Sequence, residues 1–182
     1  MFFTRRGDDG NTDLIGGPRL PKDDLRIAAL GDLDEATSAI GLARASARGE
    51  DTRAALLHTQ KDLYLLMADV ATTTGQALEQ PRLASPQIDA LEAVITGFDG
   101  RVSIPKEFVA SGDSIGGATL DVARSVVRRA ERTIAHLLLT GSGANPDMVR
   151  YLNRLSSLLF GLARYEDSLA GVAPTISKEI VE

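Results

Sequence analysis

The sequence predicts an all-α protein, a single domain built as a five-helix up-and-down bundle, and three observations support this fold class. Apolar residues recur at steps of three and four in five separate segments, which is the period of a helix with one buried face. No segment shows the alternation of apolar and polar residues that is typical of a strand. The chain of 182 residues has no internal repeat and is long enough to bury one core. We therefore expect one domain over 1–182.

The clearest pattern runs from Leu120 to Ala135 and predicts a helix with a continuous apolar stripe. That stripe contains Leu120, Ala123, Val127, Ala130, Ile134 and Leu137. The range 148–167 predicts a second helix as its companion. Its stripe contains Met148, Leu152, Leu155, Leu159, Leu162 and Leu169. Asn153 lies beside this second stripe, where it is either a surface residue or part of a ligand site.

Three further helices are expected, at about 30–47, at about 52–74 and from Ser85 onward. Ser85 suits the N-cap and Pro86 the first helical position, and Asn145-Pro146 should begin the last helix of the chain. The acids Asp32, Asp34 and Glu35 would then lie in the first turn of the first helix, where they suit the helix dipole. The inner faces should contain Leu33, Ala36, Ile40, Ala43, Leu56, Leu63, Met67, Val70, Ile88, Leu91, Ile95 and Phe98.

Two predicted loops, 1–24 and 100–117, are long for a helical bundle, and long loops are often functional. The first combines glycines with Thr4, Arg5 and Arg6, a composition that suits phosphate, because glycines let backbone N–H groups approach closely. It lacks the GxxxxGK[ST] pattern, and a frayed polar terminus is the alternative interpretation. The second loop carries Phe108, which without other information would be interpreted as an aromatic packed into the core.

Arg124, Arg128 and Arg132 follow one another at steps of four on one face of the helix over 120–135. Like charges at this spacing repel, so something anionic is expected to face them. Carboxylates of another helix or subunit, or a polyphosphate ligand, would both serve. The acid Asp34 is a candidate for the first role. A solvated basic face is the alternative.

Composition excludes several classes of function. With a net charge of −5, nonspecific nucleic-acid binding is not expected. No apolar run approaches the ~20 residues of a membrane span, and the N-terminal sequence lacks the apolar region of a signal peptide. The chain has no cysteine, so it has no disulfide or thiolate nucleophile, which is compatible with the cytoplasm. His58 and His136 lie in different predicted helices, so neither a histidine metal site nor a Ser-His-Asp triad is expected. If the protein is an enzyme, its substrate should supply the nucleophile.

Three sequence blocks together indicate a family. They are FTRRGDDGNTDLIGG followed by PKDDLRIAALGDLDE near the start, LDVARSVVRRAER in the fourth expected helix, and YLNRLSSLLFGLARYED in the fifth. In content, order and spacing the chain resembles the PduO-type corrinoid adenosyltransferases, which transfer adenosyl from ATP to cob(I)alamin. The resemblance covers nearly the whole chain, and the combination of TRxGDxG, VxRRAER and LNRLS is specific.

The resemblance implies a ferritin-like five-helix bundle assembled as a homotrimer, with Mg²⁺ and ATP in a cleft between subunits. The range 1–24 would be the nucleotide-binding loop and 100–117 the loop on the corrin side. Asp34 and Arg124 match an acid–arginine pair between subunits, Arg128 would stabilise the leaving triphosphate, and Phe108 would lie beneath the corrin and exclude its lower ligand. A flavin reductase and an adenosylcobalamin-dependent acceptor enzyme are implied partners. The residues that match the ATP contacts are Thr4, Arg5, Arg6, Gly7, Thr12, Asp13, Lys22, Arg128, Arg129, Glu131, Arg132 and Asn153.

The chain departs from the family pattern at three places. The range 109–113 replaces the usual Pro-Gly-Gly after the phenylalanine, Asp121 replaces a histidine, and Ser157 replaces an acid. Two alternatives to an adenosyltransferase therefore stay open: a trimer that binds ATP or adenosylcobalamin without catalysis, as a carrier or sensor, and a helical scaffold without a ligand.

Overall fold

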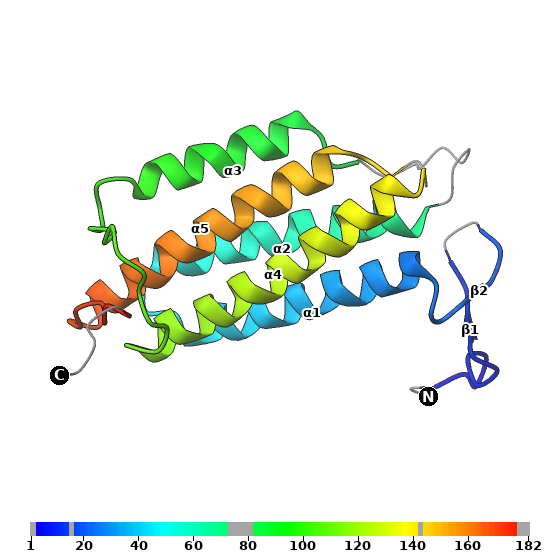
Figure 1. Ribbon diagram of the computed structural model, residues 1–182, viewed down its shortest axis with the longest axis horizontal. Helices are drawn as coiled ribbons and strands as arrows, with labels where there is room; N and C mark the ends of the chain where they lie inside the picture. The colour runs from blue at the N-terminus through cyan, green and yellow to red at the C-terminus, as the bar shows by residue number, and fades with distance from the viewer. Residues whose placement is uncertain (1–2, 15–16, 73–81, 142–143, 178–182) are drawn as a thin grey trace.

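The computed structural model describes residues 3–14, 17–72, 82–141 and 144–177. Its helices are α1 (Leu25–Ser46), α2 (Glu50–Ala71), α3 (Ser85–Phe98), α4 (Ile115–Leu139) and α5 (Asp147–Leu169). Each helix runs antiparallel to the one before it (Figure 1). The predicted five-helix up-and-down bundle is confirmed.

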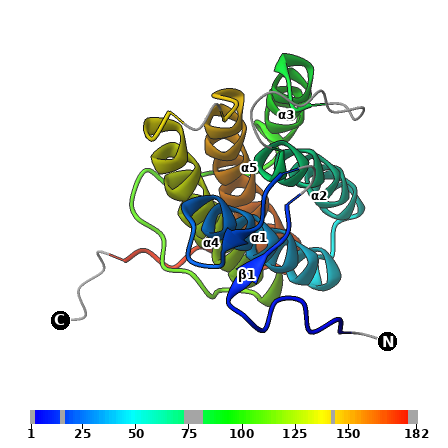
Figure 2. The same ribbon diagram turned by 90° about the vertical axis from the view of Figure 1, so that its right-hand side faces the viewer.

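Helix α4 lies at the centre of the packing, because it contacts both α5 and α1 along its length. Helix α3 lies on the outside and packs against α5 (Figure 2). The predicted stripe of α4 is buried throughout, and so are the predicted inner residues of α1. Three predicted core residues differ: Leu169 at the end of α5 is exposed, and Met67 of α2 and Ile95 of α3 are only partly buried.

Helix α1 begins five residues earlier than the expected start at residue 30. Asp24 is its N-cap, and the Asp24 carboxylate accepts a hydrogen bond from the backbone N–H of Arg26 at 2.8 Å. The expectation that Asp32, Asp34 and Glu35 belong to the first turn was therefore wrong. They lie in the second and third turns, where the helix dipole contributes little.

The other helix ends differ from expectation by a few residues. Helix α2 ends at Ala71 rather than Thr74. Helix α3 has Ala84 as its N-cap and not Ser85, and the Gln87 side chain accepts a hydrogen bond from the Ala84 backbone N–H at 3.0 Å. At α5 the N-cap is Pro146, and the Asn145 side chain accepts from the backbone N–H of Asp147 at 3.0 Å, so the last helix begins directly after Asn145-Pro146.

The first turn of α4 approaches α5 very closely. Gly116 and Gly117, which were expected to be loop residues, are buried in this turn. A Cβ atom at Gly117 would lie 2.1 Å from a carboxylate oxygen of Asp167, closer than any real contact. Glycine at this position lets α4 begin directly against α5.

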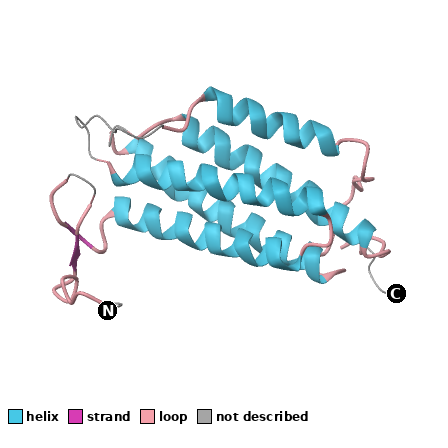
Figure 3. Ribbon diagram, turned by 180° about the vertical axis from the view of Figure 1, so that it is seen from behind, coloured by secondary structure: helices cyan, strands magenta, loops and turns pink. Residues whose placement is uncertain are grey.

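The described part of the N-terminal range 1–24 is not entirely irregular. Strands β1 (Asn11–Thr12) and β2 (Leu20–Pro21) pair antiparallel and form a small hairpin outside the bundle (Figure 3). The hairpin lies beside the start of α1, whereas the loop between α3 and α4 lies at the opposite end of the bundle (Figure 1). Among the described helices, none has the length and apolar character needed to cross a membrane.

Candidate active site

The arginines of α4 differ in their surroundings. Arg129, which is not one of the three arginines at steps of four, contacts the acids of α1: its Nε atom donates to Asp32 at 3.2 Å, and its Nη2 atom pairs with Glu35. Thr133 also donates to Asp32, at 2.5 Å. The expected carboxylates from another helix therefore exist within the chain, but they meet Arg129.

Arg124 and Arg128 face the other side of α4. Arg124 donates from Nε to Asp121 one turn earlier, at 3.1 Å. Among the described residues, Arg128 and Arg132 have no ion pair or side-chain hydrogen bond, and both are exposed. Two guanidinium groups on this helix therefore remain available to an anion.

An open cavity of about 600 Å³ brings three predicted site residues together. Phe108 lines it from the loop between α3 and α4, while Arg124 and Arg128 line it from α4. Phe160 and Ser157 of α5 also line it, as do Lys106 and Glu107 of the loop. Two aromatic rings and three cationic side chains thus border a space large enough for much of a sizeable ligand.

The Phe108 side chain is 79% exposed. The interpretation of Phe108 as an aromatic packed into the core was therefore wrong. A large apolar side chain held in solvent beside a cavity lacks a folding role, and such exposure is typical of a contact residue for a ligand or partner.

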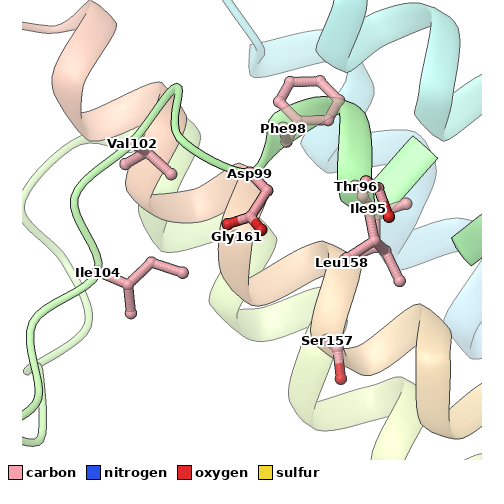
Figure 4. A pocket seen from close by; sticks show the side chains of 9 residues that line it. All are labelled: Ile95, Thr96, Phe98, Asp99, Val102, Ile104, Ser157, Leu158 and Gly161. Carbon is pink, nitrogen blue, oxygen red and sulfur yellow. The ribbon is translucent and has the colours of Figure 1, made fainter. Parts of the chain in front are cut away.

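A second, smaller cavity of about 210 Å³ lies next to the first, between α3 and α5. Figure 4 shows its wall, in which apolar side chains predominate. Ile95, Ile104 and Ser157 line both cavities. Ser157, one of the departures from the family pattern, therefore lies at the junction of the two spaces.

The N-terminal residues form their own polar cluster. The Lys22 ammonium donates to the Gly7 carbonyl at 2.7 Å, and Arg6 pairs with Asp13 at 3.0 Å. Arg19 bridges Asp9 at 2.9 Å and Asp13 at 3.4 Å. The structure thus brings Arg6, Gly7, Asp13 and Lys22 together in one cluster. Arg19 was missed, because an arginine after Gly-Gly-Pro fits no motif that we considered.

Two backbone features of this cluster point to function. Arg5 has a φ of 60°, a left-handed conformation that is uncommon for a non-glycine residue and often marks functional sites. Gly7 lies so close to the Lys22 side chain that a Cβ atom would be 3.1 Å from the Lys22 ammonium. Thr4 and Thr12 lie on either side of this turn, Thr4 exposed and Thr12 half-buried.

The two groups of residues that were predicted to bind ATP do not contact each other in the chain. Among the described residues, no hydrogen bond or ion pair joins the range 3–22 to Arg128, Arg129, Glu131 or Arg132. Asn153 is near the second group, since its amide donates to the Glu131 carboxylate at 3.1 Å. Asp34 is exposed on α1 and does not contact Arg124 in the chain.

Comparison with known proteins identifies the family. A family model described as "Cobalamin adenosyltransferase" matches residues 2–166. The chain belongs to the cobalamin adenosyltransferase family. A corrinoid adenosyltransferase of Citrobacter freundii is 38% identical over 172 residues, which cover 94% of this chain and 97% of that protein. A second relative from the same organism, the corrinoid adenosyltransferase PduO, is 39% identical over 91% of this chain, but the chain spans only about half of its length.

A solved structure supports the same adenosyltransferase fold. It is the PduO-type ATP:corrinoid adenosyltransferase from Lactobacillus reuteri, in a variant in which alanine replaces one phenylalanine, complexed with cobalamin and ATP. The TM-score is 0.87 at 29% identity, with 98% of this chain and 100% of that chain covered. The family resemblance and the fold inferred from the sequence are therefore confirmed.

This adenosyltransferase-family chain also contains a buried charged cluster that sequence reasoning missed. Arg164 of α5 donates to Asp167 and to Asp121, each at 2.9 Å, and all three side chains are almost fully buried. Glu166 beside them accepts hydrogen bonds from the backbone N–H groups of Arg48 and Gly49. The available signal was a set of charged residues at positions that continue the inner face of α5.

Proposed function

We propose that the protein transfers the 5′-deoxyadenosyl group of ATP to the cobalt of cob(I)alamin and releases triphosphate. The observation that supports this most directly is the cavity in which Phe108 faces Arg124 and Arg128. A corrin needs an apolar contact, and a leaving triphosphate needs cationic groups. Both are present in one space, in a chain of the cobalamin adenosyltransferase family.

The reaction requires no acid or base from the protein. The electron pair of Co(I) forms the new bond to C5′ of the ribose, the C5′–O bond breaks, and its electrons leave with the triphosphate. Catalysis then consists of holding the two substrates in line and stabilising the expelled charge. Arg128 suits that role because its guanidinium has no ion pair among the described residues. Lys22 suits it from the N-terminal loop.

We assign the ATP contacts to two neighbouring subunits of a homotrimer. This assignment is supported by the separation of the two groups in the chain, since among the described residues no hydrogen bond or ion pair joins the N-terminal group to the arginines of α4. One subunit would supply Thr4, Arg5, Arg6, Gly7, Thr12, Asp13 and Lys22. Its neighbour would supply Arg128, Arg129, Glu131, Arg132 and Asn153. In the same assembly Asp34 of one subunit would pair with Arg124 of the next.

Mg²⁺ belongs to this proposal as the counterion of ATP. Among the described residues, no group of three or more His, Asp or Glu side chains is arranged to hold a metal ion. Triphosphate oxygens are good ligands for Mg²⁺, which commonly binds together with nucleotide phosphates. A flavin reductase that supplies Co(I), an adenosylcobalamin-dependent acceptor enzyme and a cytoplasmic location complete the proposal.

One observation favours a second candidate. The loop over 109–113 differs from the family pattern and pairs with the C-terminal segment. If this pairing closed the corrin side, the trimer would bind ATP or adenosylcobalamin as a carrier or sensor without forming the Co–C bond.

Anaerobic turnover separates the two candidates. The protein is mixed with chemically reduced cobalamin and Mg-ATP, and the visible spectrum and released triphosphate are followed. Adenosylcobalamin and triphosphate should appear in equal amounts over many turnovers. Tight binding of Mg-ATP and cobalamin without a Co–C bond would instead establish the carrier, and no thermal shift with Mg-ATP would leave only a scaffold.

A further inference from the structure

After α5 the chain turns back along the loop that carries Phe108. The backbone N–H of Ser177 donates to the carbonyl of Phe108 itself at 2.8 Å, and the N–H of Ala110 donates to the carbonyl of Thr175 at 2.8 Å. Val109 and Ile176 lie opposite each other in an antiparallel bridge. The C-terminal segment 172–177 is therefore hydrogen-bonded to the backbone on both sides of the bridge.

A side-chain contact fastens the same segment. One carboxylate oxygen of Asp113 accepts from the Thr175 hydroxyl at 2.6 Å, and the other accepts from the Thr175 backbone N–H at 2.9 Å. These two hydrogen bonds hold the pKa of the Asp113 carboxyl below its usual value, so the acceptor is ionised at neutral pH. Hydrogen bonds to a charged group are the stronger kind.

The contact between Asp113 and Thr175 lies directly beside a residue that is hydrogen-bonded to the helices of the bundle. Ser114, the next residue, is the N-cap of α4 and accepts from the Gly117 backbone N–H at 2.9 Å. The Ser114 hydroxyl in turn donates to the buried carboxylate of Asp167 at 2.7 Å. A rigid point of the bundle thus lies directly beside Asp113, whereas terminal segments without such contacts are usually poorly ordered.

Burial does not position Phe108, because its ring is 79% exposed. The backbone pairing to segment 172–177 is the contact that fixes its carbonyl. We propose that Asp113 and Thr175 are positioning residues, which fix Phe108 at the mouth of the cavity by fastening the C-terminal segment to its loop. This inference rests on the proposed function and on the role that the family resemblance implies for Phe108, the exclusion of the lower ligand of the corrin.

The consequence concerns one step of the reaction. A displacement of about 1 Å in a positioned group can cost up to about a hundredfold in rate. With the segment released, Phe108 would no longer exclude the lower ligand, and cob(II)alamin would keep that ligand and be harder to reduce. Transfer from cobalt that has already been reduced to Co(I) does not need this exclusion and would be spared.

The first test uses Thr175→Val, which removes the hydroxyl but keeps the size and the backbone N–H, and Thr175→Ser, which restores the hydroxyl. The protein is mixed with Mg-ATP and cob(II)alamin, and the four-coordinate Co(II) signal is measured. Thr175→Val should lower this signal and slow adenosylation from cob(II)alamin by about tenfold, as expected for a lost hydrogen bond to a charged group. With Co(I) supplied chemically, its rate should stay within about twofold, and Thr175→Ser should behave as wild type.

Thr140→Val is the matched control, since it removes one threonine hydroxyl at the opposite end of α4 and should change neither measurement. Hydrogen exchange of the Ala110 and Ser177 amides, measured without ligands, should speed up in Thr175→Val alone. Equal rate losses from cob(II)alamin and from Co(I) would overturn the inference, and so would an unchanged four-coordinate signal. If the wild type forms no adenosylcobalamin from Co(I), the proposed function itself fails, while the exchange measurement still tests the fastening.

Discussion

Arg164 of α5 donates from Nη2 to Oδ2 of Asp121 on α4 at 2.9 Å, and neither side chain is more than 4% exposed. The other oxygen of Asp121 accepts from Arg124 at 3.1 Å. The carboxylate of Asp121 therefore connects a buried arginine to one that lines the cavity. Asp121 has become part of a buried ionic cluster.

Asp121→Asn should destabilise the fold by about 3–5 kcal/mol, because it leaves the Arg164 charge buried with one partner fewer. Urea unfolding at matched protein concentration measures the change. Glu92→Gln, which breaks the half-exposed contact of Glu92 with Arg154, is the control and should cost about 0–1 kcal/mol. Equal midpoints for the two variants would show that the buried cluster contributes no more than a surface pair.

Arg128→Ala should remove about 2–4 kcal/mol of transition-state stabilisation. This loss lowers turnover roughly thirtyfold to a thousandfold. Arg128→Lys should also be impaired, because a lysine cannot form a two-point contact with phosphate oxygens. Arg150→Ala, which removes an exposed arginine paired with Asp147, is the control. Turnover of Arg128→Ala within about threefold of wild type would remove Arg128 from the proposed mechanism.

Mg-ATP should protect the N-terminal range 3–22 from trypsin, which cleaves after exposed basic residues such as Arg5, Arg6 and Lys22. The expected cause is contact between these residues and the triphosphate. Adenosine, which lacks phosphates, should give no protection. Equal cleavage with and without Mg-ATP would argue against a nucleotide loop.

Phe108→Ala should leave the free energy of unfolding nearly unchanged, because the ring is exposed. ATP affinity should also be kept. Adenosylation should slow strongly when the reaction starts from cob(II)alamin and much less when Co(I) is supplied. The same loss in both assays would assign Phe108 to corrin binding rather than to exclusion of the lower ligand.

Asp34→Asn should weaken the trimer, lower activity, or both, if Asp34 pairs with Arg124 of a neighbour. Arg124→Ala should cost more, since it also removes one of the two arginine partners of Asp121 within its own chain. The double variant should lose less than the sum. Light scattering across a dilution series gives the mass, and turnover is measured in the same buffer. A monomeric wild type would eliminate the interface, and a stable, fully active Asp34→Asn trimer would eliminate the pair.

The apolar stripes predicted the helices well, because burial of one face imposes a period that a sequence shows directly. The start of α1 was missed because Asp24, its N-cap, follows two other polar residues, and such a polar run is typical of a loop. The ionic cluster of Asp121, Arg164 and Asp167 was missed for a different reason. The role of a charged residue on an inner face cannot be predicted until its ion-pair partner on another helix is known. Here the packing of α4 against α5 identifies that partner.

The predicted site residues were identified from motifs, yet their arrangement needed the fold. Nothing in the spacing of Phe108 and Arg128 shows that they face one cavity, because they belong to a loop and a helix that meet only through packing. Neither the exposure of Phe108 nor the contacts of Thr175 could be predicted from the sequence. The Thr175 contacts in particular depend on the path of the chain after α5.

The placement of the N-terminal hairpin and of the loop of Phe108 has a genetic consequence. Three antiparallel helices, α1 to α3, separate the two, which places them at opposite ends of every chain (Figure 1). In the proposed homotrimer each catalytic centre is therefore formed by two copies of the chain. A chain damaged at Lys22 and a chain damaged at Arg128 would each be inactive alone, but in mixed trimers some centres would combine the intact half of each. Two such alleles would complement one another.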